Sequence, residues 1–516
     1  MISLRRLRLR VSIFLLAIFC STVLAEAKAP NIVFIFTDDH ACQSIGAYGS
    51  KINKTPNIDR IAQAGAVFEN SFCANSICGP SRACVLTGKH SHKNGFYSNG
   101  RGPFDGTQFT FPQLLRKSGY QTALVGKWHL NSNPTGFDHW DILPGQGSYY
   151  NPVFITAQGR RRVEGYCTTI TTDLALNWLK DRDQKKPFLL MCQHKAPHRT
   201  WAPELKHLNN YADQDIPEPP TLFDEYKNRS ETLAGNAMSI DQHFYYHYDL
   251  KVHLPVPFAT KRETRLRDGE YGRMTPEQRK TWDAAFLPRN KAFLANPPKG
   301  KDLVRWKYQR YIKNYLRCID SVDENVGRVL DYLDENGLTD NTIVIYSSDQ
   351  GFYLGEHGWY DKRWMFEESL KMPFIVRWPG HIEPGTRNKN LIQNIDYAPT
   401  FLDAAGVDIP AEIQGKSLLP VFAEPNSPNW RESIYYHYYE HGGEHQVPRH
   451  EGVRTSQFKL INFYSNDGFN LFDLKTDPQE IQDVSRDPEY ADTLSRMRKE
   501  LQRLRKQYDL PALKSK

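Results

Sequence analysis

The chain has 516 residues, 40% hydrophobic and 24% charged, with a formal net charge of +7 at pH 7. Single hydrophobic cores stop growing at roughly 250 to 300 residues, so we expect two domains. The eight cysteines show no spacing typical of a small disulfide scaffold, and the absence of a long run of Lys and Arg argues against a nucleic-acid partner.

Residues 1–25 are predicted to be a secretory signal peptide. Four arginines within residues 5–10 precede the apolar stretch 11–24, and small residues at Ala25 or Ala27 offer a cleavage site. No other apolar run of about twenty residues follows, so we expect no integral membrane segment after signal cleavage. The protein is therefore expected to be exported, periplasmic or secreted. An uncleaved membrane anchor is the alternative.

Two apolar runs of strand length end in oxygen-bearing side chains. Residues 31–37 lead into Asp38 and Asp39, and a second run later in the chain leads into Asp349 and Gln350. Neither run alternates, which favours central strands of a parallel sheet. Ligands bind beyond the carboxyl ends of such strands. These oxygens suit Ca²⁺ first, with Mg²⁺ possible, rather than Zn²⁺. Taken alone, either group of oxygen-bearing side chains would more often be a helix cap or part of a solvated loop.

The segment Cys78-Gly79-Pro80-Ser81-Arg82 continues to Gly88. Its cysteine could be a packed thiol beside a turn, because Pro ends the preceding element. The eleven residues nevertheless resemble the signature of the type I sulfatases. The resemblance implies that a formylglycine-generating or radical maturation enzyme oxidises Cys78 to formylglycine before or during export. The hydrate would supply the nucleophilic oxygen, and its sulfate ester would collapse to the aldehyde, which divides one hard step into two.

Three further segments are similar to sulfatase motifs. Lys127 and His129 follow a strand-like run, and Lys362 lies shortly after Asp349. His198 follows another apolar run and is assigned the catalytic imidazole, with His194 as its rival. A lone His or Lys at any of these places would usually be structural, but the order and spacing of the segments favour a common site.

The resemblance implies a metal site formed by Asp38, Asp39, Asp349, Gln350 and the oxygen of modified Cys78. Sulfatases commonly have Asn or His where Gln350 stands. The amide oxygen of Gln can still coordinate, from one methylene further out.

The resemblance also implies the catalytic roles. Lys127 and Lys362 would hold the sulfate oxygens, and Arg82 would orient the hydrate with fixed positive charge. His198 would protonate the departing sugar oxygen, and His129 would remove the proton of the second hydroxyl.

Strands alternate with helical stretches from residue 29 to 390, including apolar residues at helical spacing within 303–338. The resemblance implies an α/β catalytic domain, 29–390, with an alkaline-phosphatase-like, mostly parallel sheet flanked by helices. A polar stretch, 205–300, either shapes a substrate cleft or is an elaborated loop. Residues 391–516 are expected to form a smaller C-terminal α+β domain. It would contain an antiparallel sheet with strands at 451–455, 458–461 and 470–474, and a helix at 488–508.

The segments 143–152 and 194–201 look closest to those of exo-acting N-acetylglucosamine-6-sulfatases of glycan-degrading bacteria. The implied substrate is a sulfated carbohydrate. One alternative is a sulfatase of another polysaccharide, marine or glycosaminoglycan. Another is a phosphatase or phosphonate hydrolase of the alkaline phosphatase superfamily, which would be expected to have a Ser or Thr nucleophile and two zinc ions. A third is a non-catalytic scaffold that binds sulfated glycans, if Cys78 is unmodified.

Sugar recognition requires polar groups near aromatic faces. The candidates are Asp361, Arg363, Trp364, His437, His441 and His450. Six cysteines besides Cys78 remain after signal cleavage and could pair in an oxidising compartment. The absence of Cys-x-x-Cys argues against structural zinc.

Overall fold

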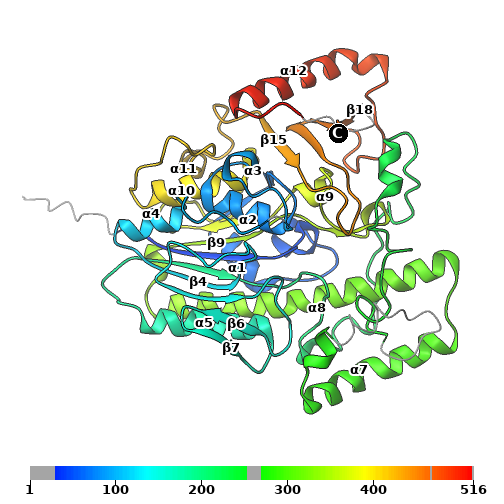
Figure 1. Ribbon diagram of the computed structural model, residues 1–516, viewed down its shortest axis with the longest axis horizontal. Coiled ribbons are helices and arrows are strands. Elements are labelled where there is room, and N and C mark those ends of the chain that lie inside the picture. Colours follow the sequence, from blue (N-terminus) through cyan, green and yellow to red (C-terminus); the bar gives the residue numbers. More distant parts are fainter. Residues whose placement is uncertain (1–28, 101, 253–268, 465–467, 514–516) are drawn as a thin grey trace, which may run out of the picture.

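The computed structural model describes residues 29–100, 102–252, 269–464 and 468–513. The proposed signal peptide lies outside these residues. A ten-stranded sheet with helices on both faces forms the larger part, and a four-stranded antiparallel sheet with a terminal helix forms the smaller one (Figure 1). Among the described residues, no helix combines the length and apolarity needed to cross a bilayer.

The strands are β1 (Asn31–Thr37), β2 (Ala66–Phe68), β3 (Ser71–Phe72), β4 (Gln121–Lys127), β5 (His139–Leu143), β6 (Val153–Thr156), β7 (Gly159–Arg162), β8 (Phe188–Gln193), β9 (Thr342–Ser348), β10 (Tyr353–Leu354), β11 (Tyr360–Asp361), β12 (Phe374–Arg377), β13 (Thr386–Asn388), β14 (Ile392–Gln393), β15 (Ser433–Tyr438), β16 (His450–Thr455), β17 (Phe458–Phe463) and β18 (Gly468–Asp473). The α-helices are α1 (Pro56–Gln63), α2 (Cys78–Thr87), α3 (Ser91–Asn94), α4 (Phe111–Lys117), α5 (Cys167–Asp181), α7 (Pro276–Ala295), α8 (Gly300–Glu335), α9 (Glu367–Leu370), α10 (Tyr397–Ala404), α11 (Leu419–Ala423) and α12 (Ala491–Gln507). Short 3-10 turns connect several of them.

The large sheet has the strand order β13-β2-β12-β9-β1-β8-β4-β5-β6-β7. Its five central strands, β9 to β5, are mutually parallel, whereas β12, β6 and β7 run antiparallel to their neighbours. The predicted mostly parallel sheet is confirmed. All seven residues of β1 are buried, as expected for a strand covered on both faces.

Side chains of β1 alternate between two core layers. Phe34 packs in the layer shared with α2, α4 and α10, whereas Ile35 packs in the layer shared with α1, α5 and α8. In Figure 1 these two groups of helices lie above and below the sheet. The sheet therefore presents its strand ends, rather than a face, to solvent and ligands.

The C-terminal sheet has the order β15-β16-β17-β18, antiparallel throughout. One of its faces packs against α12 through residues such as Leu460 and Leu501. Its other face, including Ile461 and Tyr436, joins the core of the large sheet. The predicted antiparallel C-terminal sheet and terminal helix are confirmed. Helix α10, which follows the expected boundary at residue 390, packs with α2 and α4 in the core of the larger part.

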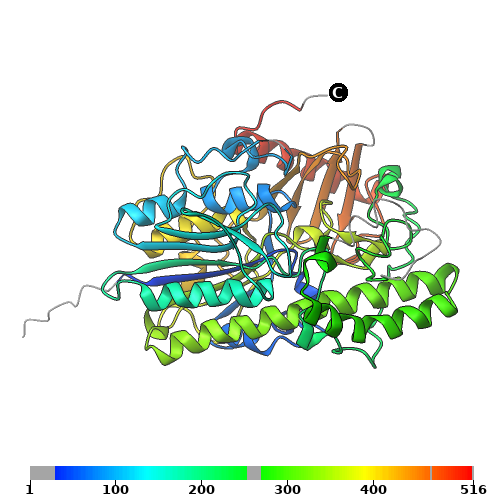
Figure 2. The same cartoon turned by 60° about the horizontal axis from the view of Figure 1, so that its bottom comes forward.

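The polar stretch 205–300 contains a helix that the sequence analysis did not anticipate. Helix α7 begins after Thr275, whose side chain forms a capping box with Gln278. It lies alongside the N-terminal part of α8 (Figure 2), and the rings of Phe293 and Trp306 stack 3.9 Å apart. The described part of this stretch that forms α7 therefore packs on α8 and is not merely a loop.

Candidate active site

Four adjacent parallel strands, β9, β1, β8 and β4, bring most of the predicted site residues to one edge of the sheet. Asp349 and Gln350 follow β9, Asp38 and Asp39 follow β1, the segment with His198 follows β8, and Lys127 ends β4 with His129 two residues on. Because these strands are parallel, their carboxyl ends coincide.

Cys78 is the first residue of α2 and is 1% exposed. Pro80 has no backbone N–H. It is tolerated in the first turn of α2 because backbone N–H groups in the first turn of a helix have no intrahelical acceptor. Gly79 is required by close packing, since a Cβ there would lie 2.8 Å from Asn99 Oδ1, the atom that accepts a hydrogen bond from the Gly79 N–H at 3.0 Å. Burial raises the pKa of the Cys78 thiol to about 12, so the unmodified thiol is uncharged.

Three buried carboxylates meet at this edge. Oxygens of Asp38, Asp39 and Asp349 lie within 4.8 Å of one another, and all three residues are fully buried. Two further oxygens, Asp38 Oδ1 and Gln350 Oε1, are buried without a hydrogen-bond partner among the described residues. Three converging carboxylates and an unpartnered amide oxygen are donors that hard divalent cations such as Ca²⁺ or Mg²⁺ prefer.

Arg82 connects the nucleophile helix to this cluster. Its Nε and Nη2 donate to Asp349 Oδ2 at 3.1 and 3.0 Å, and its Nη1 donates to Gln193 Oε1 at 2.6 Å and to the Lys127 carbonyl at 2.9 Å. The guanidinium also lies 5.0 Å from the ring of Phe36. These contacts fix a permanent positive charge beside Cys78.

Two lysines face the carboxylates. Lys127 Nζ contacts Asp38 Oδ2 and donates to Gln146 Oε1 at 2.5 Å. Lys362 Nζ lies 2.6 and 2.8 Å from the two oxygens of Asp39. Burial alone would lower the pKa of Lys362, but the Asp39 carboxylate outweighs it and raises that pKa above its ordinary value. Lys362 therefore stays charged.

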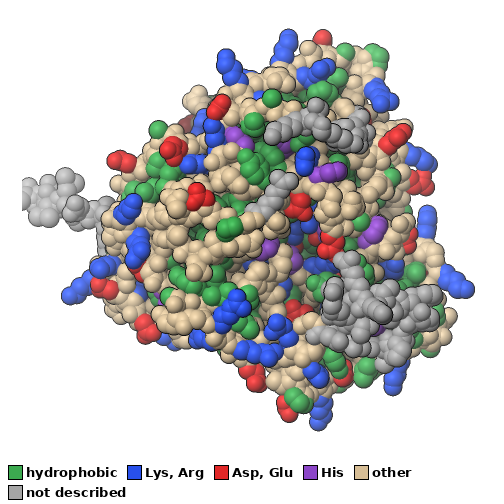
Figure 3. Space-filling view, in the orientation of Figure 1, with side chains coloured by type: hydrophobic (Ala, Val, Ile, Leu, Met, Phe, Trp, Pro, Cys, Tyr) green, Lys and Arg blue, Asp and Glu red, His purple; other side chains and the backbone are tan. Residues whose placement is uncertain are grey.

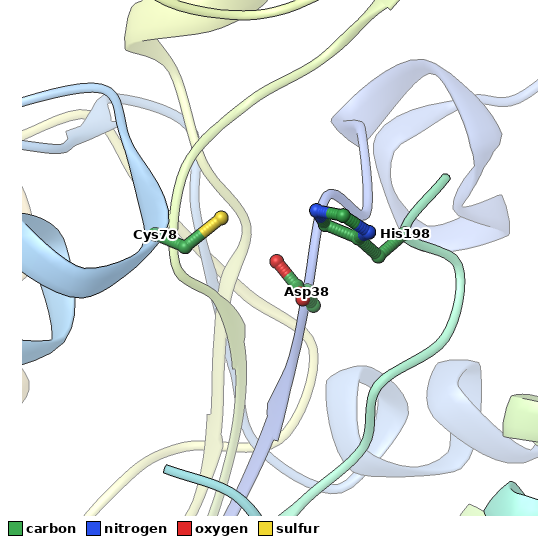
Figure 4. Close-up of side chains that lie close together, drawn as sticks. All are labelled: Asp38, Cys78 and His198. Atoms are coloured by element: carbon green, nitrogen blue, oxygen red, sulfur yellow. The ribbon is translucent and has the colours of Figure 1, made fainter. Parts of the chain in front are cut away.

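The structure places His198, not its rival His194, beside Cys78. Ligand atoms of Asp38, Cys78 and His198 lie within 4.8 Å of one another, and the three side chains converge from separate segments (Figure 4). His198 Nδ1–H donates to the Arg199 carbonyl at 2.5 Å, which leaves Nε2 facing the cluster, 3.8 Å from Asp39 Oδ2. His194 is buried, with Nε2 3.7 Å from Cys192 Sγ.

Burial lowers the pKa of His198, and the neighbouring Lys127 and Lys362 lower it further. An anion bound between the two lysines would favour protonation of Nε2. His129 is 8% exposed, and its pKa is likewise lowered, first by burial and then by Lys127 and Arg82. Its Nδ1 is buried without a hydrogen-bond partner among the described residues.

Four residues at this site have a left-handed backbone. Asp39, His129, Asp361 and Arg363 have φ values of 67°, 56°, 80° and 93°, in the left-handed region that non-glycine residues rarely adopt. Such conformations persist only where the surrounding structure imposes them. The strained backbone aims side chains of residues adjacent in sequence in different directions.

The candidate sugar-binding residues fall into two groups. Asp361 and Arg363 flank Lys362 and contact each other, and His445 Nε2 lies 3.3 Å from Asp361 Oδ2. Trp364, His437 and His450 are instead buried in packing contacts, and stacking between Trp364 and His450 at 5.5 Å is one of them. His441 is exposed on the loop after β15.

Three residues at the site were not singled out by the sequence analysis: Gln146, Gln193 and His445. Gln193 ends β8 and could have been found as a polar residue at a strand terminus. Gln146 and His445 lie in loops that carry no such signal. All seven cysteines among the described residues are free and buried.

The fold and this cluster indicate a class of hydrolase site: converging buried carboxylates and fixed positive charge around one residue at a helix N-terminus. Two family models match the chain. The model described as Sulfatase matches residues 30–407, and the model described as N-sulphoglucosamine sulphohydrolase, C-terminal, matches residues 355–507. The chain belongs to the sulfatase family and is a sulfuric ester hydrolase.

Relatives match over nearly the whole chain. An N-acetylglucosamine-6-O-sulfatase of Bacteroides thetaiotaomicron is 47% identical over 490 residues, which cover 94% of this chain and 87% of the relative. The human N-acetylglucosamine-6-sulfatase is 26% identical, covering 81% of this chain and 69% of its own length. A solved structure of a protein in complex with its substrate D-glucosamine-2-N,6-O-disulfate superposes with a TM-score of 0.90. It is 46% identical, and the match covers 93% of this chain and 98% of that one.

Proposed function

We propose that this sulfatase hydrolyses a sulfate ester on a carbohydrate, and specifically removes the 6-O-sulfate of N-acetylglucosamine at the end of a sulfated glycan. The observation that carries the proposal is the convergence of Cys78, three carboxylates, Arg82, two lysines and His198 at one strand edge. The relative that is 47% identical supports the choice of sugar and position.

We propose that Cys78 is converted to formylglycine, which as its hydrate supplies an oxygen nucleophile in place of the buried thiol. Asp38, Asp39, Asp349 and Gln350 would hold Ca²⁺, or Mg²⁺, which would supply positive charge to the sulfate. The donor set described above supports this assignment.

The remaining roles follow from charge and hydrogen bonding. Lys127 and Lys362 would hold the sulfate oxygens and offset the charge that develops on them. The anionic sulfate would in turn favour protonation of His198 Nε2, the atom that faces the cluster and would donate to the departing sugar oxygen. His129, with an unpartnered buried nitrogen, would accept a proton from residue 78. Asp361, Arg363 and His445 would contact the sugar hydroxyls.

The decisive experiment has two readouts on the purified mature protein. Mass spectrometry of the peptide with residue 78 should show formylglycine. Sulfate release should be rapid from N-acetylglucosamine 6-sulfate and slow from its 3-sulfate. Cys78→Ala should abolish release while it keeps the thermal unfolding midpoint of the wild type. Unmodified Cys78 in a fully active preparation, or more than trace activity of Cys78→Ala, would contradict the mechanism. A preference for the 3-sulfate would contradict only the substrate.

We also propose that residues 1–25 direct export to the periplasm or outside the cell, on the basis of their composition. N-terminal sequencing of the protein from the culture medium or periplasm would test this. A cytoplasmic protein that retains Met1 would contradict it.

A further inference from the structure

A groove runs along the C-terminal helix, between α12 and the segments 389–391, 427–433 and 455–458, and encloses about 1180 Å³. We refer to it as the α12 groove. None of the residues of the candidate active site lines it. It is therefore a separate feature of the molecule.

The lining of the α12 groove is strongly basic. It contains six basic side chains against two acidic ones: Lys389, Lys416, Arg431, Arg496, Lys499 and Arg503, with Glu432 and Glu500. Glu500 already forms an ion pair with Arg503, whose Nη2 lies 2.7 Å from Glu500 Oε1. The exposed Lys389, Lys416, Arg496 and Lys499 form no ion pair within the described part of the chain. The groove therefore carries an excess of positive charge. Figure 3 shows Lys and Arg side chains along the top of the molecule, over α12.

Aromatic faces are interleaved with these cations. Lys416 Nζ lies 5.8 Å from the centre of the Trp430 ring, and Arg496 Cζ lies 5.8 Å from that of Phe458. The Trp430 indole is fixed because its Nε1–H donates to the Leu391 carbonyl at 2.7 Å. Aromatic rings beside charged groups can pack on the apolar faces of sugar rings while the cations bind anionic substituents.

Arg431 lines the groove beside Trp430, with its guanidinium 5.2 Å from the centre of that ring. Its side chain is 8% exposed, and its Nη2 donates to Asp396 Oδ1 at 2.6 Å. Its Nη1 is buried and has no hydrogen-bond partner among the described residues, and a buried donor without a partner is costly. A sulfate or carboxylate that reached the guanidinium from the groove would satisfy this donor.

We propose that the α12 groove binds an anionic stretch of a sulfated polysaccharide, at a site distinct from the catalytic cluster. The occupant is chosen by charge complementarity and by the proposed function, on which this inference rests, because that function already brings the enzyme to polyanionic glycans. Binding in the groove holds the polymer on the enzyme between hydrolytic events. It contributes nothing to the hydrolysis of a small sulfated sugar.

The test uses heparin as the polymer and measures its dissociation constant by calorimetry in a Cys78→Ala background, where no sulfate is released. Arg496→Gln combined with Lys499→Gln removes two exposed groove cations and should weaken binding about tenfold. The matched control is Lys280→Gln with Lys291→Gln, which removes two exposed cations from α7 and should leave the constant unchanged. Trp430→Ala should weaken heparin binding as well.

The same two double variants are also made in protein that retains Cys78. There they should keep the wild-type rate on N-acetylglucosamine 6-sulfate and differ only in their affinity for the polymer. Equal losses in the α12 and α7 variants would indicate non-specific attraction and overturn the proposal. Equally tight binding of single-stranded DNA would overturn the glycan assignment. Absence of turnover on every sulfated sugar would refute the proposed function instead, whatever the heparin result.

Discussion

An ion pair between Arg199 and Asp249 anchors the loop with His198 to the 205–300 stretch. Breaking this ion pair should lower the free energy of unfolding substantially. Arg199 is 7% exposed, and its Nε and Nη2 each donate to Asp249 at 2.7 Å, where Asp249 is fully buried. The guanidinium also lies 5.1 Å from the ring of Tyr360. Asp249→Asn leaves a buried guanidinium without its charge partner. Such a loss costs about 3 to 5 kcal/mol. We expect the lower end, about 3 kcal/mol, because Glu444 remains 3.5 Å from Arg199.

The measurement is urea-induced unfolding of wild type and Asp249→Asn, with the slope compared as well as the midpoint. The matched control is Asp173→Asn. It breaks an exposed pair with Arg328 and should cost less than about 1 kcal/mol. The His198 imidazole is positioned by the Arg199 carbonyl, so kcat on a sugar sulfate should also fall for Asp249→Asn. A loss of stability no larger than that of Asp173→Asn would refute the reasoning.

The remaining predictions concern the cation, the acid and pH. A strong chelator should inactivate the enzyme and Ca²⁺ or Mg²⁺ should restore it; restoration by Zn²⁺ alone would contradict the oxygen donor set. Asp39→Asn should weaken metal binding more than Gln350→Ala, because only the former removes a charge, and calorimetric titration with Ca²⁺ checks the order. His198→Ala should cost on the order of 10² in kcat/KM on the sugar sulfate and far less on nitrophenyl sulfate, whereas His194→Ala should show no such difference; the reverse pattern would move the acid role. Burial raises the pKa of Asp323 to about 6, above the ordinary value of about 4 for an aspartate, so its ionisation opposes folding increasingly as pH rises from about 4 to 6. The stability of Asp323→Asn relative to wild type should therefore increase across that window, and a flat difference would contradict the shift.

The strand ends were predictable because their chemistry is local. A non-alternating apolar run of strand length, such as β1 or β9, is typical of a doubly covered strand, and a polar group directly after such a strand is expected at the sheet edge. The adjacency of β9, β1, β8 and β4 then follows from the fold that the motifs imply. This is why Asp38, Asp349 and Lys127 could be grouped without coordinates.

The placement of Trp364 and the presence of helix α7 depend on the local backbone direction and on long-range packing, which the sequence motifs do not specify. Trp364 is two residues from Lys362, but the left-handed backbone at Asp361 and Arg363 turns these neighbours apart, so adjacency in sequence did not mean adjacency in the site. Helix α7 was missed because its buried residues are few and separated by charges, although the capping box at Thr275 signalled its start.

The burial of Cys78 implies that any enzyme that modifies this residue must act before the chain has folded. At 1% exposure in a fully buried helix, residue 78 offers no surface to another enzyme once the chain has folded. The core strand β1 also pairs with β9, more than 300 residues later, as the contact between Asn31 and Thr342 illustrates. Such distant pairing is slow, and it cannot begin until most of the chain has been made. The interval in which residue 78 is still accessible is therefore set by the topology of the sheet. Under the proposed conversion of Cys78 to formylglycine, variants that speed the pairing of β1 with β9 should show a smaller converted fraction by mass spectrometry.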